Sequence, residues 1–270
     1  MINEDLARAH AFAHRIDART STDVIPVPGG AAYLDREYLV RYMSNFLFID
    51  APGAVPPERW IEDADRILGG AGCHHRTVTF ADPADVQRMA MTFLENGYTV
   101  DGGVLLVQRG EPERPHDLVT VEEVTFAELR PLLVTSYRRE SWATDEASVQ
   151  ALVDYRGKLE RTIGARFFMT RVDGEPAGCC ELYLDGDEAQ VESVDTLAEY
   201  RNRGLASAAV LRAVAEAKAA GAAWVFLWAD DDDWPQHWYA RLGFREAART
   251  AEFLRWPAGE GPSPKSTVRG

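Results

Sequence analysis

The chain of 270 residues has few cysteines and no long apolar run. Its cysteines, Cys73, Cys179 and Cys180, lack the spacing of a metal site, and adjacent cysteines seldom pair. No stretch approaches the roughly 18–20 apolar residues that span a bilayer. Residues 1–15 are polar and charged and lack the apolar segment of a signal peptide. We therefore expect reduced thiols, no metal, no membrane partner and a cytoplasmic location.

Basic residues are also in the minority. Acidic residues outnumber them 43 to 29, so the net charge is −14. A surface of this sign repels a phosphate backbone, which argues against a nucleic-acid partner. It would attract a cationic amine, although the charge can equally be a solvated face. The hydrophobic fraction of 46% and the charged fraction of 27% are typical of globular domains, and the length suits one large domain or two ordinary ones.

Two segments have the composition of domain boundaries. Residues 110–117, GEPERPHD, place two prolines and several charges between apolar segments, as an exposed linker does. Residues 257–270 contain almost nothing apolar and are expected to form a disordered tail. The expected division is therefore an N-terminal domain over residues 1–112, a second domain over residues 118–256, and the tail.

The second domain shows a regular succession of strand and helix patterns. Its order predicts an α/β (α+β) fold, in which helices flank a mixed, mostly antiparallel central sheet. A helix over residues 127–140 places Pro131 in its first turn, and Thr144 is the expected N-cap of the next helix, which reaches Thr162. The expected strands are 118–126, 165–172, 177–184, 190–196, 223–229 and 244–256, and the later helices are 207–220 and 235–242.

The N-terminal part repeats this order. Expected helices over residues 57–68 and 82–95 alternate with expected strands over 73–80 and 98–108. Both parts end in an aromatic-bearing helix, a glycine and an aromatic residue that opens the last strand, as in FLENGYTVDGGVLLVQR and WYARLGFREAARTAEFLRW. This similarity suggests a duplicated domain whose first copy is degenerate. The alternative is that glycine ends helices generally.

The sequence RNRGLA, residues 201–206, lies between a strand and a long alanine-rich helix. Backbone N–H groups at the start of a helix have no intrahelical partners, and the helix dipole adds partial positive charge there. Such a loop is a cradle for a pyrophosphate. Gly204 permits close approach of the backbone, and Ala206 is small enough to do the same. Arg201 and Arg203 add positive charge.

This loop fits the Q/R-x-x-G-x-G/A pattern of the GNAT N-acetyltransferase superfamily. An aliphatic strand precedes it, an amphipathic helix follows it, and the strand AAWVFLWA comes next. Further along, WYARLGF resembles the family's aromatic-Tyr-x-x-Leu-Gly-Phe signature. The resemblance covers residues 118–256 and implies a GNAT-type fold there, with the N-terminal part completing a tandem of two such domains.

The resemblance implies an enzyme that transfers an acetyl group from acetyl-CoA to an amine by direct attack in a ternary complex, without a metal. The end of strand 190–196 would bind the pantetheine arm as an added strand, and the loop would bind the pyrophosphate. Asp232 stands where an asparagine commonly contacts CoA, in an acidic run that either lines the acceptor mouth or faces water. The implied cofactor-binding residues are Val194, Asp195, Thr196, Arg201, Asn202, Arg203, Gly204, Leu205, Ala206, Ser207 and Asp232.

Two catalytic residues follow from the same resemblance. Tyr239 matches the tyrosine that protonates the leaving thiolate; the alternative is a core aromatic beside Leu242. Glu192 matches a glutamate that accepts the amine proton directly or through water, Glu181 is the second candidate, and an ordinary surface or ion-paired glutamate is the plain alternative. Strand alternation places Asp195 on the face opposite Glu192.

The N-terminal part has no matching loop. Its equivalent, IDAPGAVPPERW, is too rich in proline to present a series of N–H donors, so we expect it to have lost CoA binding. It would complete the acceptor pocket or a dimer contact. The acceptor is a small-molecule amine or a peptide amine, and the protein a monomer or homodimer. The rival functions are a non-catalytic acyl-CoA sensor or scaffold, and transfer of a longer acyl chain or to a hydroxyl.

Overall fold

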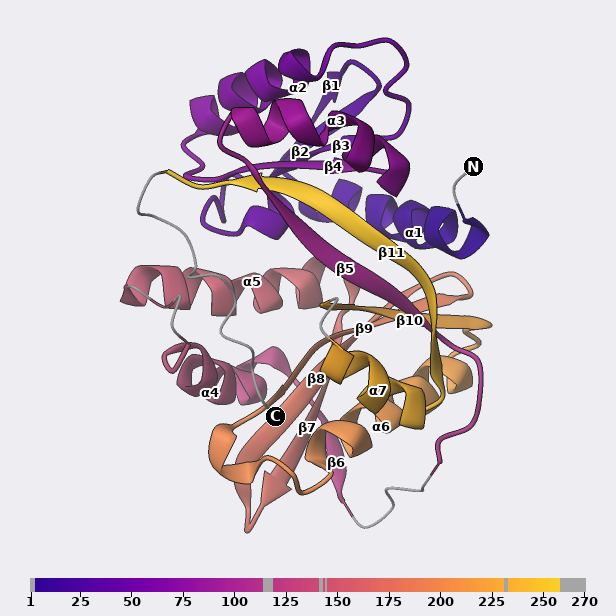
Figure 1. Cartoon of the computed structure of the whole chain (residues 1–270). Helices are drawn as coiled ribbons and strands as arrows, with labels where there is room; N and C mark the ends of the chain where they lie inside the picture. Colours follow the sequence, from indigo (N-terminus) through magenta and orange to yellow (C-terminus); the bar gives the residue numbers. More distant parts are fainter. Residues whose placement is uncertain (1–2, 114–118, 141–142, 144, 231–232, 258–270) are drawn as a thin grey trace. The chain divides into compact units, whose positions relative to one another are not determined.

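The chain forms two compact units in this computed structural model, which describes residues 3–113, 119–140, 143, 145–230 and 233–257 (Figure 1). The first unit runs to Val104 and also includes the segment that begins at Ala247. The second unit runs from Leu105 to Glu246. Both boundaries fall inside strands, because β5 spans Thr99–Gln108 and β11 spans Phe244–Arg255. Each unit thus contains a strand segment that sequence order alone would give to the other.

The described residues of the first unit form three α-helices, a short 3-10 helix at Tyr42–Ser44 and a mixed sheet. Its sheet joins β1 to β2, β2 to β3 and β4 to β11 in antiparallel pairs, whereas β3 and β4 are parallel. The helix between the parallel strands is followed by one π-helical turn at Asp65–Gly69. Besides the strand segments already given, the elements are α1 (Glu4–Thr20), β1 (Asp23–Val27), β2 (Gly30–Leu34), β3 (Phe46–Ile49), α2 (Pro57–Ala64), β4 (Arg76–Phe80) and α3 (Pro83–Glu95).

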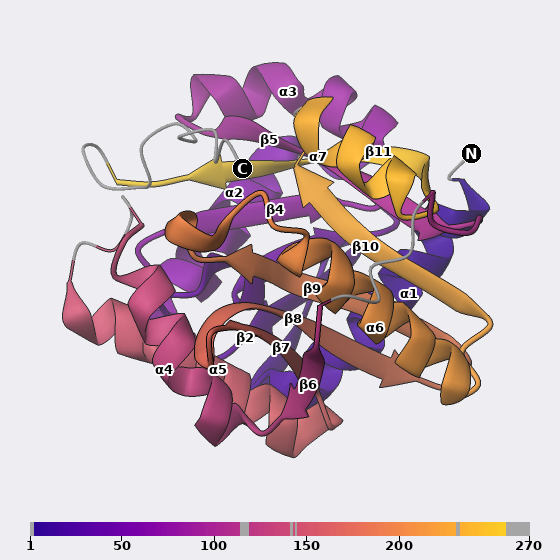
Figure 2. The same cartoon turned by 90° about the horizontal axis from the view of Figure 1, so that it is seen from below.

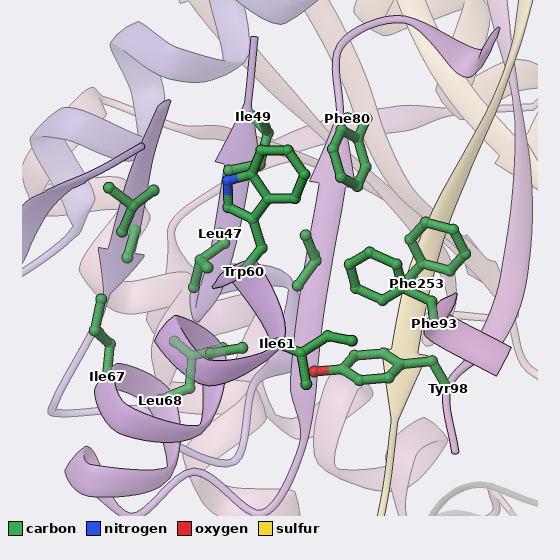
Figure 3. Packing of buried hydrophobic residues seen from close by; sticks show 14 of the residues in the cluster. Leu47, Ile49, Trp60, Ile61, Ile67, Leu68, Phe80, Phe93, Tyr98 and Phe253 are labelled. Carbon is green, nitrogen blue, oxygen red and sulfur yellow. The ribbon is translucent and has the colours of Figure 1, made fainter. Parts of the chain in front are cut away.

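Aromatic side chains form the centre of the core of the first unit (Figure 3). Phe253 of β11 stacks on Phe93 of α3 with ring centroids 4.0 Å apart, and Phe80 meets both rings edge to face. Trp60 is fully buried, and its indole N–H donates to the carbonyl of Pro28 at 2.7 Å. Phe253 is also fully buried. The part of β11 that begins at Ala247 therefore belongs to the core of the first unit.

From β7 onward, the second unit repeats the order of strands and helices that the first unit shows from β1 onward. Strands β6, β7, β8 and β9 pair antiparallel in sequence order, and β9 then pairs with β10 in parallel across α6. Figure 1 shows α4 and α5 on one side of these strands and α6 and α7 on the other. The elements are β6 (Val121–Val124), α4 (Phe126–Tyr137), α5 (Glu146–Ile163), β7 (Arg166–Val172), β8 (Glu175–Asp185), β9 (Glu188–Thr196), α6 (Leu205–Ala219), β10 (Trp224–Asp230) and α7 (Asp233–Arg241).

Local sequence signals explain most boundaries in the second unit. Thr125 and Glu128 form a capping box that starts α4. Gly164, with φ of 67°, ends α5, and the Asp173-Gly174 pair, with φ of 52° and 87°, turns β7 into β8. The expected mixed, mostly antiparallel sheet flanked by helices is therefore confirmed.

Two details differ from the expectations. The N-cap of α5 is Asp145, whose carboxylate accepts from the Ser148 amide at 2.8 Å, whereas Thr144 lies outside the described residues. Since the capping box starts α4 at Phe126, Pro131 lies in the second turn, not the first. Among the helices of the described ranges, none has the length and hydropathy to cross a membrane.

Candidate active site

The loop after β9 reaches α6 through two residues in the left-handed conformation. Asn202 has φ of 62° and Gly204 has φ of 78°, and Gly204 is the N-cap of α6. The helix begins with a hydrogen bond from the Ala208 amide to the Gly204 carbonyl at 3.0 Å. The amides of residues 205–207 precede that bond and have no intrahelical acceptor. This geometry leaves an open helix terminus at the place where the sequence predicts an anion site.

The two arginines of the loop make different contacts. Arg201 donates from Nε to the carbonyl of Thr196 at 3.1 Å and so ties the loop to the end of β9. The guanidinium of Arg203 lies over the ring of Tyr200, 5.6 Å from its centroid, and the side chain is exposed. Arg203 is therefore the more accessible of the two positive charges, whereas Arg201 also holds the loop in place.

The parallel strands β9 and β10 separate before they end. Their paired register runs from Glu188–Trp224 to Gln190–Phe226. Beyond it, β9 continues to Thr196 and β10 to Asp230. Val194, Asp195 and Thr196 therefore lie on a part of β9 that faces β10 outside this register. An extended ligand can hydrogen-bond to such an unpaired edge as an added strand.

Tyr239 lies on α7, beside the start of α6. Its neighbour Trp238 donates from the indole N–H to the Ser207 hydroxyl at 3.0 Å, which links the two helices. Tyr239 is buried, and burial raises the pKa of its phenol above the usual range. Nearby Glu192 and Cys180 raise that pKa further. The phenol therefore stays protonated at neutral pH and is available as a hydrogen-bond donor.

A β-bulge in β9 changes which side chains share a face of the sheet. Cys179 pairs with Asp195 and Glu181 with Glu192, so two residues of β9, 193 and 194, lie opposite one residue of β8. Cys179 and Glu181 are two residues apart and share a face, and directly paired residues share it too. Asp195 and Glu192 therefore lie on the same face. Simple alternation, which places them on opposite faces, is wrong here because it ignores the extra residue.

The two candidate bases have different surroundings. Glu181 is fully buried; it accepts from Arg156 Nε at 2.9 Å and from the Tyr183 hydroxyl at 2.5 Å. Glu192, which pairs with Glu181 across the strands, is only partly buried. Its carboxylate accepts a hydrogen bond from the side-chain amide of Gln190 at 2.6 Å. A carboxylate enclosed by an arginine and a phenol is poorly placed to collect a proton from a ligand. The geometry thus favours Glu192 over Glu181.

Further acidic groups lie at the end of β9. The Ser136 hydroxyl of α4 donates to the Asp195 carboxylate. Burial raises the pKa of half-buried Glu140, and the charge of Asp195 raises it further. Asp195 thus lies on the separated end of β9 with its carboxylate in an acidic environment.

The cysteines and the acidic run bear on the remaining expectations. Cys179 and Cys180 are fully buried, and burial holds the pKa of both thiols well above the usual range, so neither is a ready nucleophile. Asp232 lies outside the described residues. Within the described part of the chain, no group of three or more His, Cys, Asp or Glu side chains is arranged to hold a metal ion.

Sequence reasoning missed Arg156, Tyr183 and Ser193. A signal for Arg156 exists: it follows Val149 and Val153 at helical spacing and precedes Leu159, so it lies on the buried face of α5. A charged residue within such an apolar stripe requires a partner. The left-handed conformation of Ser193 has no comparable signal, since serine is common in strands and turns alike.

A separating pair of parallel strands, an open helix terminus beside it and a buried tyrosine near both define an acyltransferase of the GNAT type. The acetyltransferase (GNAT) family matches residues 126–244, and this part of the chain belongs to it. The chain is thus an acyltransferase with a GNAT domain in its second unit.

Solved structures support the fold over nearly the whole chain. A GCN5-related N-acetyltransferase from Kribbella flavida is 20% identical with a TM-score of 0.65, covering 94% of this chain and 96% of its own. A conserved protein of unknown function from Staphylococcus epidermidis is 14% identical with a TM-score of 0.66, covering 87% and 94%. A tandem GNAT protein from the clavulanic acid biosynthesis pathway is 16% identical with a TM-score of 0.55, covering 87% and 80%. A comparison with curated protein sequences finds no match.

Proposed function

We propose that the second unit transfers an acetyl group from acetyl-CoA to an amine by direct attack in a ternary complex. The observation that carries the proposal is the separated end of β9, with the partly buried carboxylate of Glu192 on that strand and the buried phenol of Tyr239, whose pKa responds to the charge of Glu192. A carboxylate can accept the amine proton, and a phenol can donate to the departing sulfur.

Acetyl-CoA would bind along two surfaces. The pantetheine arm would pair with the backbone of residues 194–196, where β9 has left its register with β10. The pyrophosphate would accept hydrogen bonds from the amides of residues 202–207, at the positive end of the α6 dipole. Arg203 would add charge, and Arg201 would hold the loop against β9. Asp232, which lies outside the described residues, would be a further contact of CoA.

In the reaction, the amine nitrogen bonds to the thioester carbonyl carbon and the carbon–sulfur bond breaks. The nitrogen's proton passes to Glu192, directly or through water, and CoA leaves as a thiolate. Because the pKa of Tyr239 lies above that of a thiol, about 8.5, full proton transfer to the sulfur is uphill. Tyr239 therefore acts first as a hydrogen-bond donor that stabilises the developing thiolate, and the proton follows.

We further propose a cationic acceptor, either a small amine or a peptide amine. Glu192 and Asp195 share one face of the sheet, and Glu140 lies near Asp195. Together with the net charge of −14, these carboxylates favour an ammonium group over a nucleic acid.

The first unit lacks the equivalent anion site in this proposal. Its helix α2 begins at Pro57 with Pro56 as N-cap, and no side chain caps it. Two consecutive prolines remove two of the N–H donors that α6 offers. We therefore propose one active site per chain, with the first unit as a degenerate copy.

The test is thiol release from acetyl-CoA over a panel of amines, with Tyr239→Phe compared to wild type. We expect kcat to fall by a factor on the order of 10–100, as for loss of one acid–base group. Tyr98→Phe is the matched control, because Tyr98 is also buried and its hydroxyl has no hydrogen-bond partner. Unchanged turnover in Tyr239→Phe would refute the catalytic role of the phenol.

The same assay separates the rival functions. Binding of acetyl-CoA without amine-stimulated thiol release would support the non-catalytic sensor or scaffold. Release stimulated by alcohols, or faster with longer acyl donors, would support the other transfer reactions.

A further inference from the structure

We propose that Arg156 is a positioning residue that holds the β9 bulge, and through it the backbone of residues 194–196 relative to Glu192, in the arrangement that the reaction requires. The inference rests on the proposed function, because its consequence is an effect on acetyl transfer. It assigns a role to a helix residue that belongs neither to the CoA loop nor to the pair Glu192 and Tyr239.

Arg156 joins three elements of the second unit. It lies on α5 and is buried, with 7% of its surface exposed. Its Nε donates to the Glu181 carboxylate of β8 at 2.9 Å, and its NH2 group donates to the Ser193 hydroxyl of β9 at 2.8 Å. The Tyr183 hydroxyl donates to the other oxygen of Glu181. One planar guanidinium thus ties the helix to both strands at the bulge, a geometry that a lysine cannot reproduce.

The bulge needs such support. Ser193 has φ of 52°, a left-handed conformation that costs free energy for a residue with a Cβ atom. Strained backbone persists only where its surroundings enforce it. The hydrogen bond from Arg156 to the Ser193 hydroxyl is a direct restraint of this kind. Without it, a regular strand pairing becomes more favourable relative to the bulge.

Loss of the bulge would change the site. The extra residue is what brings Asp195 onto the face of Glu192, whereas Glu192 itself lies before the bulge and keeps its register against Glu181. A shift of one residue turns every following side chain to the other face. The candidate base and the backbone proposed to bind pantetheine would then no longer have their present relative positions.

Arg156 also balances charge around the candidate base. Glu192 pairs with Glu181 across the strands and accepts a hydrogen bond from Gln190 on its own strand, while Arg156 and Tyr239 interact with it electrostatically. The guanidinium is the cation of this set. It is the countercharge of the buried Glu181 carboxylate, with which it forms an ion pair at 2.9 Å.

The experiment uses the full-length chain with acetyl-CoA and the best amine of the panel. Arg156→Met alone would bury an unpaired Glu181 and destabilise the fold, so the test variant is Arg156→Met with Glu181→Gln. We expect it to fold, with kcat lowered by a factor on the order of 100 and KM for acetyl-CoA raised as well, because residues 194–196 move with the bulge. The control, Arg130→Met with Asp154→Asn, removes an exposed pair between α4 and α5 and should keep wild-type turnover.

A third substitution makes the test specific to the bulge. Glycine adopts φ of 52° without strain, so adding Ser193→Gly should restore at least about tenfold in kcat to the test variant. Such rescue is not expected if Arg156 only stabilises the fold.

The outcomes are distinct. A test variant with turnover like wild type, or one that Ser193→Gly does not improve, overturns the positioning role alone. A misfolded test variant, judged by circular dichroism and thermal unfolding, also overturns it, since Arg156 is then structural. A wild-type protein that releases no CoA with any amine overturns the proposed function and this inference with it. Reduced kcat with glycine rescue supports the proposal.

Discussion

Phe253→Ala should destabilise the first unit, although Phe253 lies within the sequence range expected for the second domain. Its ring is fully buried and stacks on Phe93 at 4.0 Å with an interplanar angle of 3°. Truncating a buried phenylalanine costs about 3–5 kcal/mol, including the cavity that remains. For a unit of this size, that loss corresponds to a fall in melting temperature of about 12–20 °C.

The measurement is urea unfolding combined with hydrogen exchange resolved to peptides. We expect exchange to accelerate in β4 and α3, which surround Phe253, and to change little in α6 and β10. Phe244→Ala is the matched control: Phe244 lies on the same strand, is also fully buried and contacts Tyr239. It should loosen the second unit instead.

A loss below about 1 kcal/mol would refute the packing argument, because it falls outside the range for a buried phenylalanine. Faster exchange confined to the second unit would refute the assignment of β11 to the first.

Three further predictions concern the loop, the thiols and a buried histidine. Gly204→Val should raise KM for acetyl-CoA at least about tenfold, because φ of 78° strains a β-branched residue; an unchanged KM would remove the loop from the CoA site. Cys179 and Cys180 should resist thiol reagents at pH 8 until the protein unfolds, since burial raises the pKa of both thiols; rapid labelling of folded protein would contradict this. Burial lowers the pKa of His75 to about 4. Its unfolded form binds a proton below about pH 6.5 and its folded form does not, so stability should fall by up to about 1.4 kcal/mol per pH unit between pH 6.5 and 4. Urea unfolding of wild type and His75→Gln measures this, and equal pH dependence in both proteins would exclude His75 as the cause.

Local chemistry made the motif elements predictable. The run at residues 201–206 predicts a strand–loop–helix junction, and the structure places Gly204 at the N-cap of α6. The Asp173-Gly174 pair predicts a tight turn because both residues tolerate positive φ, and both have it. Such signals act over a few residues, so composition and spacing suffice to detect them.

The bulge at Ser193 and the partners of Glu181 were not predictable in this way. A bulge depends on the register of β9 against β8, and the restraint on it comes from a helix 37 residues away in sequence. Strand alternation therefore misplaced Asp195. The same limit applies to Glu181. From the sequence, both Glu181 and Glu192 are candidate bases, and only the folded structure shows that Arg156 and Tyr183 enclose Glu181.

The sequence by itself thus determined the order of helices and strands from residue 57 onward, the fold class and the GNAT loop, and it proposed the pair of candidate catalytic residues; the helix and three strands before residue 57 were not predicted. Tertiary structure alone decided that residues 247–255 belong to the core of the first unit and that Glu192 and Asp195 share a face. Caps, turns and periodicity depend on neighbours within one turn or strand, whereas strand partners and buried ion pairs depend on residues brought together only by folding.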